Sequence, residues 1–161
     1  MPRLARWYAL AVLLALLDQL SKYWISTSFG YGETRAVTGF FNLVLTHNKG
    51  AAFSFLASAA GWQRGFFIAV ALVAIVVISV LLARHAGERL FCLSLALILS
   101  GAIGNVIDRI ALGYVVDFLD FHFAGWHWPA FNLADSAITA GAVLLVVDSF
   151  RPGPRRAGAS P

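Results

Sequence analysis

Two aspartates, Asp117 and Asp135, are the residues of this chain best suited to do chemistry. Asp135 stands at the start of an uncharged run that continues to Val147, and Asp117 lies in a connecting segment expected near the same membrane face. An ionisable group at membrane depth costs about 3 kcal/mol on insertion scales, so it is a functional candidate by default. Two neighbouring carboxylates partly removed from water can share one proton, as in aspartic hydrolases. The pair therefore predicts acid–base hydrolysis.

Each carboxylate alone has a simpler explanation, in which Asp135 caps a helix and Asp117 caps a loop. Polar and small residues at helical spacing accompany them, however, and we expect these stripes to meet. The first stripe contains Gly101, Asn105 and Arg109, and the second contains Asn132, Asp135, Ser136 and Thr139. Both aspartates together with these two stripes favour a site over two unrelated caps.

Other catalytic chemistry finds little support. The four histidines fall in expected loops without a nucleophile partner, at His47, His85, His122 and His127. His122 and His127 with Asp120 lack the helical spacing of a zinc hydrolase motif, so we predict no metal and no cofactor. Cys92, the single cysteine, cannot form a disulfide within one chain and is interpreted as packing.

The composition is that of an integral membrane protein. Of 161 residues, 60% are apolar and 12% are charged, whereas a soluble domain carries about 25% charged residues. The length suits one bundle, so we predict a single membrane domain over residues 1–150, a disordered tail over 151–161 and a monomer. The net charge of +4 comes from basic residues at helix ends instead of a patch, which argues against nucleic acid.

The predicted fold is an all-α membrane protein with four transmembrane helices and a small extracytoplasmic β-rich segment. The helices are expected over residues 4–25, 65–83, 90–107 and 129–150, with Pro129 as the first helical residue of the last one.

Between the helices we expect three connections. Residues 26–63 form the extracytoplasmic insertion, with short strands between Phe40 and Thr46. Residues 84–89 form a tight turn, and residues 110–128 are interpreted as a loop.

The first helix resembles a signal peptide, because Arg3 and Arg6 precede an apolar run. No small-residue cleavage site follows, and the chain reads Asp18-Gln19-Leu20-Ser21-Lys22 instead. We therefore expect the helix to be retained. Asp18 and Lys22 at i, i+4 fit either a self-satisfied ion pair reaching the headgroups or a pair that also faces the active site or a lipid headgroup.

The basic residues predict the orientation. With four spans, one side holds Arg3, Arg6, Arg84, Arg89, Arg151, Arg155 and Arg156, and the other holds Lys22, Arg35, Lys49, Arg64 and Arg109 over a longer stretch. The denser side is cytoplasmic by the positive-inside rule. Both termini then lie in the cytoplasm, and the aspartates lie near the periplasmic face of the inner membrane.

Five ordered blocks resemble a known family. They are Asp18-Gln19-x-Ser21-Lys22, Asn48-x-Gly50-Ala51-Ala52-Phe53-Ser54, Gly101-Ala102-x-Gly104-Asn105-x-x-Asp108-Arg109, Val115-Val116-Asp117-Phe118 and Phe131-Asn132-x-Ala134-Asp135-Ser136. Their order along all four expected spans is similar to that of bacterial lipoprotein signal peptidase, signal peptidase II. His47 stands where this family usually has a tyrosine.

The resemblance implies a membrane aspartic endopeptidase that removes signal peptides from diacylglyceryl-modified prolipoproteins, cutting before the lipidated cysteine. It implies Asp117 and Asp135 as the catalytic pair. Supporting or substrate-binding roles are implied for Asp18, Lys22, Asn48, Gly50, Gly101, Asn105, Arg109 and Asn132. Prolipoproteins and membrane lipid are the implied partners.

Two other classes of function remain open. A small proton-coupled transporter would use an intramembrane carboxylate, but its site usually lies near the midplane between repeats, and no repeat is visible here. A non-catalytic assembly factor would use the polar stripes only for helix association.

Overall fold

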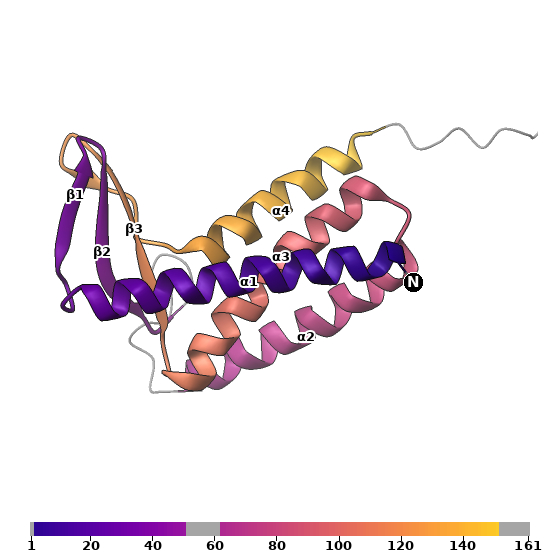
Figure 1. Cartoon of the computed structure of the whole chain (residues 1–161), viewed down its shortest axis with the longest axis horizontal. Helices are drawn as coiled ribbons and strands as arrows, with labels where there is room; N and C mark the ends of the chain where they lie inside the picture. The colour runs from indigo at the N-terminus through magenta and orange to yellow at the C-terminus, as the bar shows by residue number, and fades with distance from the viewer. Residues whose placement is uncertain (1, 51–61, 152–161) are drawn as a thin grey trace, which may run out of the picture.

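The computed structural model describes residues 2–50 and 62–151 of the chain, drawn in colour in Figure 1. Two strands separate α1 from α2, and two more separate α3 from α4. In order they are α1 (Pro2–Ser28), β1 (Thr34–Thr38), β2 (Phe41–Asn48), α2 (Trp62–Arg84), α3 (Arg89–Ala111), β3 (Val115–Phe123), β4 (Trp126–His127) and α4 (Leu133–Ser149). Residues 51–54 of the block that starts at Asn48, and the tail at 152–161, lie outside the described residues.

The helices lie lengthwise beside one another, and α3 packs against the other three. Three helices are long and apolar enough to cross a membrane: α1 from Arg3, α2 and α3. The fourth helix, α4, has 17 residues. The described part of the chain is therefore a multi-helix membrane fold with three candidate spans, one fewer than the four expected.

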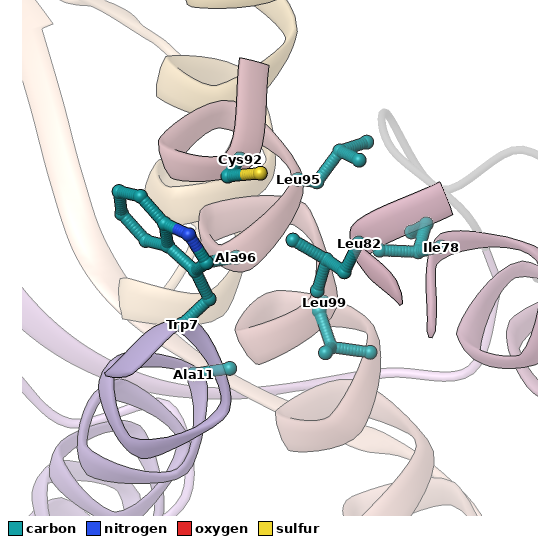
Figure 2. Packing of buried hydrophobic residues seen from close by; sticks show 8 residues of the cluster. All are labelled: Trp7, Ala11, Ile78, Leu82, Cys92, Leu95, Ala96 and Leu99. Atoms are coloured by element: carbon teal, nitrogen blue, oxygen red, sulfur yellow. The ribbon is translucent and has the colours of Figure 1, made fainter. Parts of the chain in front are cut away.

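A small apolar core joins α1, α2 and α3 at the end of the bundle remote from the sheet. Trp7 and Ala11 of α1 meet Leu82 of α2 and Leu99 of α3, among other side chains shown in Figure 2. Cys92 lies in this core, fully buried, with its thiol hydrogen-bonded to the carbonyl oxygen of His85 at 2.9 Å. This confirms that Cys92 is a packing residue.

Glycines let α3 and α4 approach closely. A side chain at Gly101 of α3 would collide with the carbonyl oxygen of Ala134, and one at Gly104 would collide with the carboxylate of Asp18. Near the other end of the contact, a Cβ at Gly141 of α4 would lie 2.6 Å from the carbonyl oxygen of Ser94. Small residues are a common means of close helix contact in membranes.

The strands form one antiparallel sheet in the order β1-β2-β3-β4. The interpretation of residues 110–128 as a loop was wrong, because this stretch contains β3 and β4. The predicted strand at 40–46 corresponds to β2, which is paired with β3 so that Thr46 faces Asp117. The sequence hid β3 because its partner lies about 70 residues earlier, a non-local pairing that short windows of sequence do not reveal.

The sheet crosses one end of the bundle (Figure 1). Val116 and Phe118 of β3 and Leu45 of β2 pack against Ile25 and Phe29 at the end of α1. The chain reverses between β3 and β4 at Ala124 and Gly125, which both have a positive φ. The sheet is thus held against the C-terminal end of α1.

The start of α4 also differs from the expectation. Pro129 is not its first residue, because α4 begins at Leu133 with Asn132 as its N-cap. Residues before the cap instead continue beside β3, where Phe131 forms an isolated bridge with Leu119. Backbone pairing with β3 competes with helix formation here, and the asparagine cap decides where the helix begins.

The close contact at Gly141 predicts a local overpacking effect. Gly141→Ala should lower stability by about 1–3 kcal/mol, because the backbone of α3 must move to admit a methyl group. Gly65→Ala in α2 is the matched control, since a methyl group added there would meet nothing within 4 Å and alanine favours helix by about 1 kcal/mol. Thermal unfolding in detergent measures both, and equal midpoints would contradict the packing described for α3 and α4.

Candidate active site

Asn132 links the two aspartates. Its side-chain oxygen accepts a hydrogen bond from the backbone N–H of Asp135 at 2.9 Å, and its backbone N–H donates to Asp135 Oδ2 at 3.4 Å. This reciprocal capping box starts α4. The Asn132 side-chain amide also donates to Asp117 Oδ1 at 2.7 Å. One fully buried residue therefore fixes the helix end and both carboxylates.

Asp117 is positioned by the sheet. It lies on β3 with 2% of its surface exposed, and its second oxygen accepts a hydrogen bond from the Asn48 amide at 3.0 Å. Burial raises the pKa of Asp117 to about 7, and the negative charge of Asp135 contributes to the rise, against the opposing effects of Asn48, Asn132 and Lys22. The side chain thus holds a proton far more readily than an ordinary aspartate.

Asp135 lies in the first turn of α4, where the helix N-terminus favours a negative charge. Asn105 of α3 donates to its Oδ1 at 2.8 Å, so the two predicted polar stripes do meet. Asp135 is half-buried and borders a cavity of about 290 Å³ together with Asn48, Arg109, Phe131 and Thr139. Asp117 lies behind this wall of the cavity, covered by Asn48.

A buried ion cluster supports Asn105 from the other side. Lys22 of α1 lies between two carboxylates, 2.8 Å from Asp18 Oδ2 and 3.0 Å from Asp108 Oδ2. The same ammonium donates to Asn105 Oδ1 at 3.1 Å. All of these charged groups are almost fully buried. The interpretation in which Asp18 and Lys22 form a pair reaching the headgroups is therefore wrong.

Asp18 and Asp108 each also hold the backbone of a neighbouring element. Asp18 Oδ1 accepts a hydrogen bond from the N–H of Ala134 at 2.9 Å, directly before Asp135. Asp108 Oδ2 accepts one from the N–H of Val116 at 3.1 Å, directly before Asp117. The ion cluster thus reaches both aspartates through the residues that precede them.

Asp108 and Gln19 are the site residues that sequence reasoning missed. The amide of Gln19 donates to Asp108 Oδ1 at 2.9 Å and to the carbonyl oxygen of Gly104 at 3.1 Å. A usable signal was present in the sequence. Gly104 and Asp108 are four residues apart, on a stripe next to that of Asn105, and Asp108 supplies a second carboxylate near a buried lysine.

Arg109 lies at the cavity from the end of α3. Its guanidinium donates to the carbonyl oxygen of Gly50 at 3.0 Å and lies over the ring of Phe67, 5.1 Å from the ring centre. Gly101 is remote from these contacts and serves the approach of α4. The predicted residues therefore lie in three neighbouring places: the cavity, the ion cluster, and the close contact between α3 and α4.

The histidines lie apart from the cavity. His127 Nδ1 is 2.9 Å from Asp120 Oδ1, and the rings of His122 and His127 are stacked at 5.1 Å. Over residues 2–50 and 62–151 no three His, Cys, Asp or Glu side chains are grouped to hold a metal ion. His47 stacks on Tyr114 with ring centres 3.9 Å apart, so this histidine fills a ring position between β2 and the start of β3.

The fold and the site define a class: a multi-helix membrane protein with one buried and one half-buried carboxylate held by amides at one end of its bundle. Residues 10–151 match the family model described as Signal peptidase (SPase) II. The chain belongs to the signal peptidase II family, and it is a peptidase of that family.

Relatives at high identity agree with this placement. The lipoprotein signal peptidase of Paraburkholderia phytofirmans (strain DSM 17436 / LMG 22146 / PsJN) is 61% identical over 148 residues, covering 92% of this chain and 86% of the relative. That of Janthinobacterium sp. (strain Marseille) is 62% identical over 145 residues, covering 90% of this chain and 88% of the relative.

Two solved structures share the fold. One, a bacterial membrane enzyme determined at 2.3 Å by the in meso method, is 28% identical with a TM-score of 0.84, over 97% of this chain and 94% of the other. A second bacterial membrane enzyme, determined at 1.9 Å by the same method, is 30% identical with a TM-score of 0.80, over 91% of this chain and 94% of the other.

Proposed function

We propose that this chain is a membrane aspartic endopeptidase that removes signal peptides from diacylglyceryl-modified prolipoproteins, with Asp117 and Asp135 as its catalytic pair. The observation that carries the proposal is the shared Asn132, which holds one carboxylate on the sheet and one on α4 within a single hydrogen-bonded unit. The family and the names of the relatives support the substrate class.

The two aspartates have different surroundings, which suggests different roles. Asp117, with its pKa raised to about 7, carries the proton and donates it to the carbonyl oxygen of the scissile bond. Asp135, at the helix N-terminus and bordering the cavity, takes a proton from the attacking water as the water oxygen bonds to the carbonyl carbon. The proton on Asp135 then passes to the leaving nitrogen, the former carbonyl oxygen returns its proton to Asp117, and the bond between carbonyl carbon and nitrogen breaks.

Asn48 controls access to Asp117 in this mechanism. Its amide covers one oxygen of Asp117 and also borders the cavity. A substrate peptide entering the cavity would replace this hydrogen bond and free the amide of Asn48 to donate to a substrate carbonyl. Arg109, which also borders the cavity, supplies several donors in a fixed fork for backbone carbonyl or ester oxygens.

The remaining predicted residues act on the pair through the scaffold. Asn105 holds Asp135, while Lys22 and Asp18 hold Asn105 and the backbone before Asp135. Gly50 offers its carbonyl oxygen to Arg109, and Gly101 lets α4 come close enough for the carboxylate to reach the sheet.

Purified protein should cut a diacylglyceryl-modified precursor much faster than the same precursor without lipid. Each buried methylene of the two acyl chains contributes about 0.8 kcal/mol to binding, so the apparent KM should rise by orders of magnitude when they are removed. Cleavage followed by mass spectrometry measures both rates. Equal rates would favour a general intramembrane peptidase, and no cleavage of either would favour the transporter or assembly factor.

The catalytic pair can be tested by conservative substitution. Asp117→Asn and Asp135→Asn should each lower the cleavage rate by about 10³-fold or more, because each removes half of the acid–base pair. Asp120→Asn, on the same strand, is the matched control and should keep substantial activity, since Asp120 bonds to Asn42 and His127 instead. An active Asp117→Asn with an inactive Asp120→Asn would overturn the assignment.

The pH profile of kcat/KM should report the proton on Asp117. Activity should fall as pH rises through about 7, where Asp117 loses the proton that it donates. Because the Asn48 amide stabilises the ionised carboxylate, Asn48→Ala should move this alkaline limb to higher pH. Asn42→Ala, which removes the equivalent bond to Asp120, should leave the limb in place. A limb unmoved by Asn48→Ala would contradict the assignment.

We also propose that α4 is the fourth span of a single membrane domain over residues 1–150. Its 17 residues reach about 26 Å, close to the roughly 30 Å of a hydrocarbon core. Support comes from its extensive packing on α3 and from apolar side chains exposed along it, such as Val143 and Val147. Residues 26–63 are then periplasmic, the site lies near the periplasmic face of the inner membrane, and both termini lie in the cytoplasm.

Reporter fusions test this arrangement. A reporter after Pro161 or in the 84–89 turn should be active only in the cytoplasm, because the denser positive charge stays inside. A reporter in the turn at Gly39, between β1 and β2, should be active only in the periplasm. A periplasmic C-terminus would show that the number of spans is three.

A further inference from the structure

The tip of the sheet carries an exposed groove lined only by aromatic rings. It has a volume of about 490 Å³, and its walls include Phe121, Phe123, Trp126, Trp128 and Phe131, here called the aromatic groove. Phe123 is 80% exposed and Trp126 is 60% exposed. Contiguous exposed apolar surface of this kind marks a binding surface.

The groove lies where the sheet extends beyond the helices. In Figure 1 the sheet crosses the end of the bundle, and its tip reaches past the start of α4. Phe131 lies one residue before the N-cap of α4 and pairs with Leu119 of β3. The groove is therefore level with the point at which α4 begins, and Leu133, two residues after Phe131, is an exposed apolar side chain at the start of that helix.

The residue types fit the boundary between headgroups and acyl chains. Trp and Tyr gather at membrane interfaces because their rings are apolar with a polar edge. Here two tryptophans stand at the rim with rings 5.8 Å apart, and His122 and His127 stack beside them. Asp120, the carboxylate next to this cluster, is bonded to Asn42 and His127 and turned away from the open groove.

We propose that the aromatic groove inserts into the outer interface of the lipid bilayer beside α4 and anchors the tip of the sheet there. The proposal rests on the proposed function only in taking α4 as a membrane span. It gives the strand that carries Asp117 a second attachment: α1 holds the base of the sheet through Phe118, and lipid holds its tip.

Site-directed spin labelling of the full chain tests the proposal. Single cysteines are introduced by Phe123→Cys or Trp126→Cys in a Cys92→Ser background, and the labelled protein is reconstituted in vesicles of 3:1 phosphatidylethanolamine and phosphatidylglycerol. Both labels should be several-fold more accessible to oxygen, relative to a water-soluble nickel complex, than a label at Ala36→Cys. Ala36 lies on β1, the edge of the sheet opposite β4, and is exposed.

Three results would overturn the anchor. Labels at 123 and 126 that meet the nickel complex as readily as the label at 36 would place the tip in water. Protection that appears only after lipidated precursor is added would make the groove a substrate site. Dipolar broadening that disappears when labelled protein is diluted with unlabelled protein would make it a contact between two copies.

The same samples separate this proposal from the peptidase assignment. Asp117→Asn should abolish cleavage and leave the accessibility of both labels unchanged, because Asp117 lies away from the groove walls. Phe123→Ser with Trp126→Ser should weaken the retention of the tip at the bilayer, seen as a several-fold loss of oxygen accessibility at a label on Phe40→Cys. Unchanged accessibility at position 40 would also count against the anchor.

Discussion

A lysine ammonium between two carboxylates, sealed from water, is the constraint on which the sheet end of this bundle depends. Lys22 joins α1 to Asp108 of α3, and its hydrogen bond to Asn105 extends the same unit towards α4. Removing one member of a buried ion pair costs about 3–5 kcal/mol, because the remaining charge stays without compensation. The cluster therefore fixes the mutual position of three helices where the site is built.

The same constraint explains why amides, and not further charges, surround the aspartate pair. Each asparagine can donate to one group and accept from another, so Asn105 and Asn132 connect the ion cluster to the carboxylates without adding net charge. With amides, burial is free to keep one proton on Asp117 near neutral pH.

Much of this arrangement could be predicted from the sequence, because membrane helices and intramembrane charges give strong local signals. The apolar runs predicted α2 and α3 to within a few residues, and the spacing of Asn105, Asn132 and Asp135 predicted that two polar stripes face one another. The sheet was harder to predict, since β3 acquires its partner only when residues distant in sequence meet. The burial of Lys22 was missed because its second carboxylate, Asp108, lies on another helix.

Because Asn132 caps α4, the two aspartates can be held together only once this helix has formed. The same side chain that ends the irregular segment and begins α4 also holds Asp117 in place. A nascent chain whose last helix has not yet formed has no cap, and its two aspartates are not held to each other. The fourth helix is made last during synthesis, so, with these aspartates as the proposed catalytic pair, hydrolytic activity cannot precede complete assembly. A membrane protease built in this way is inert while it is still being inserted among other unfolded chains.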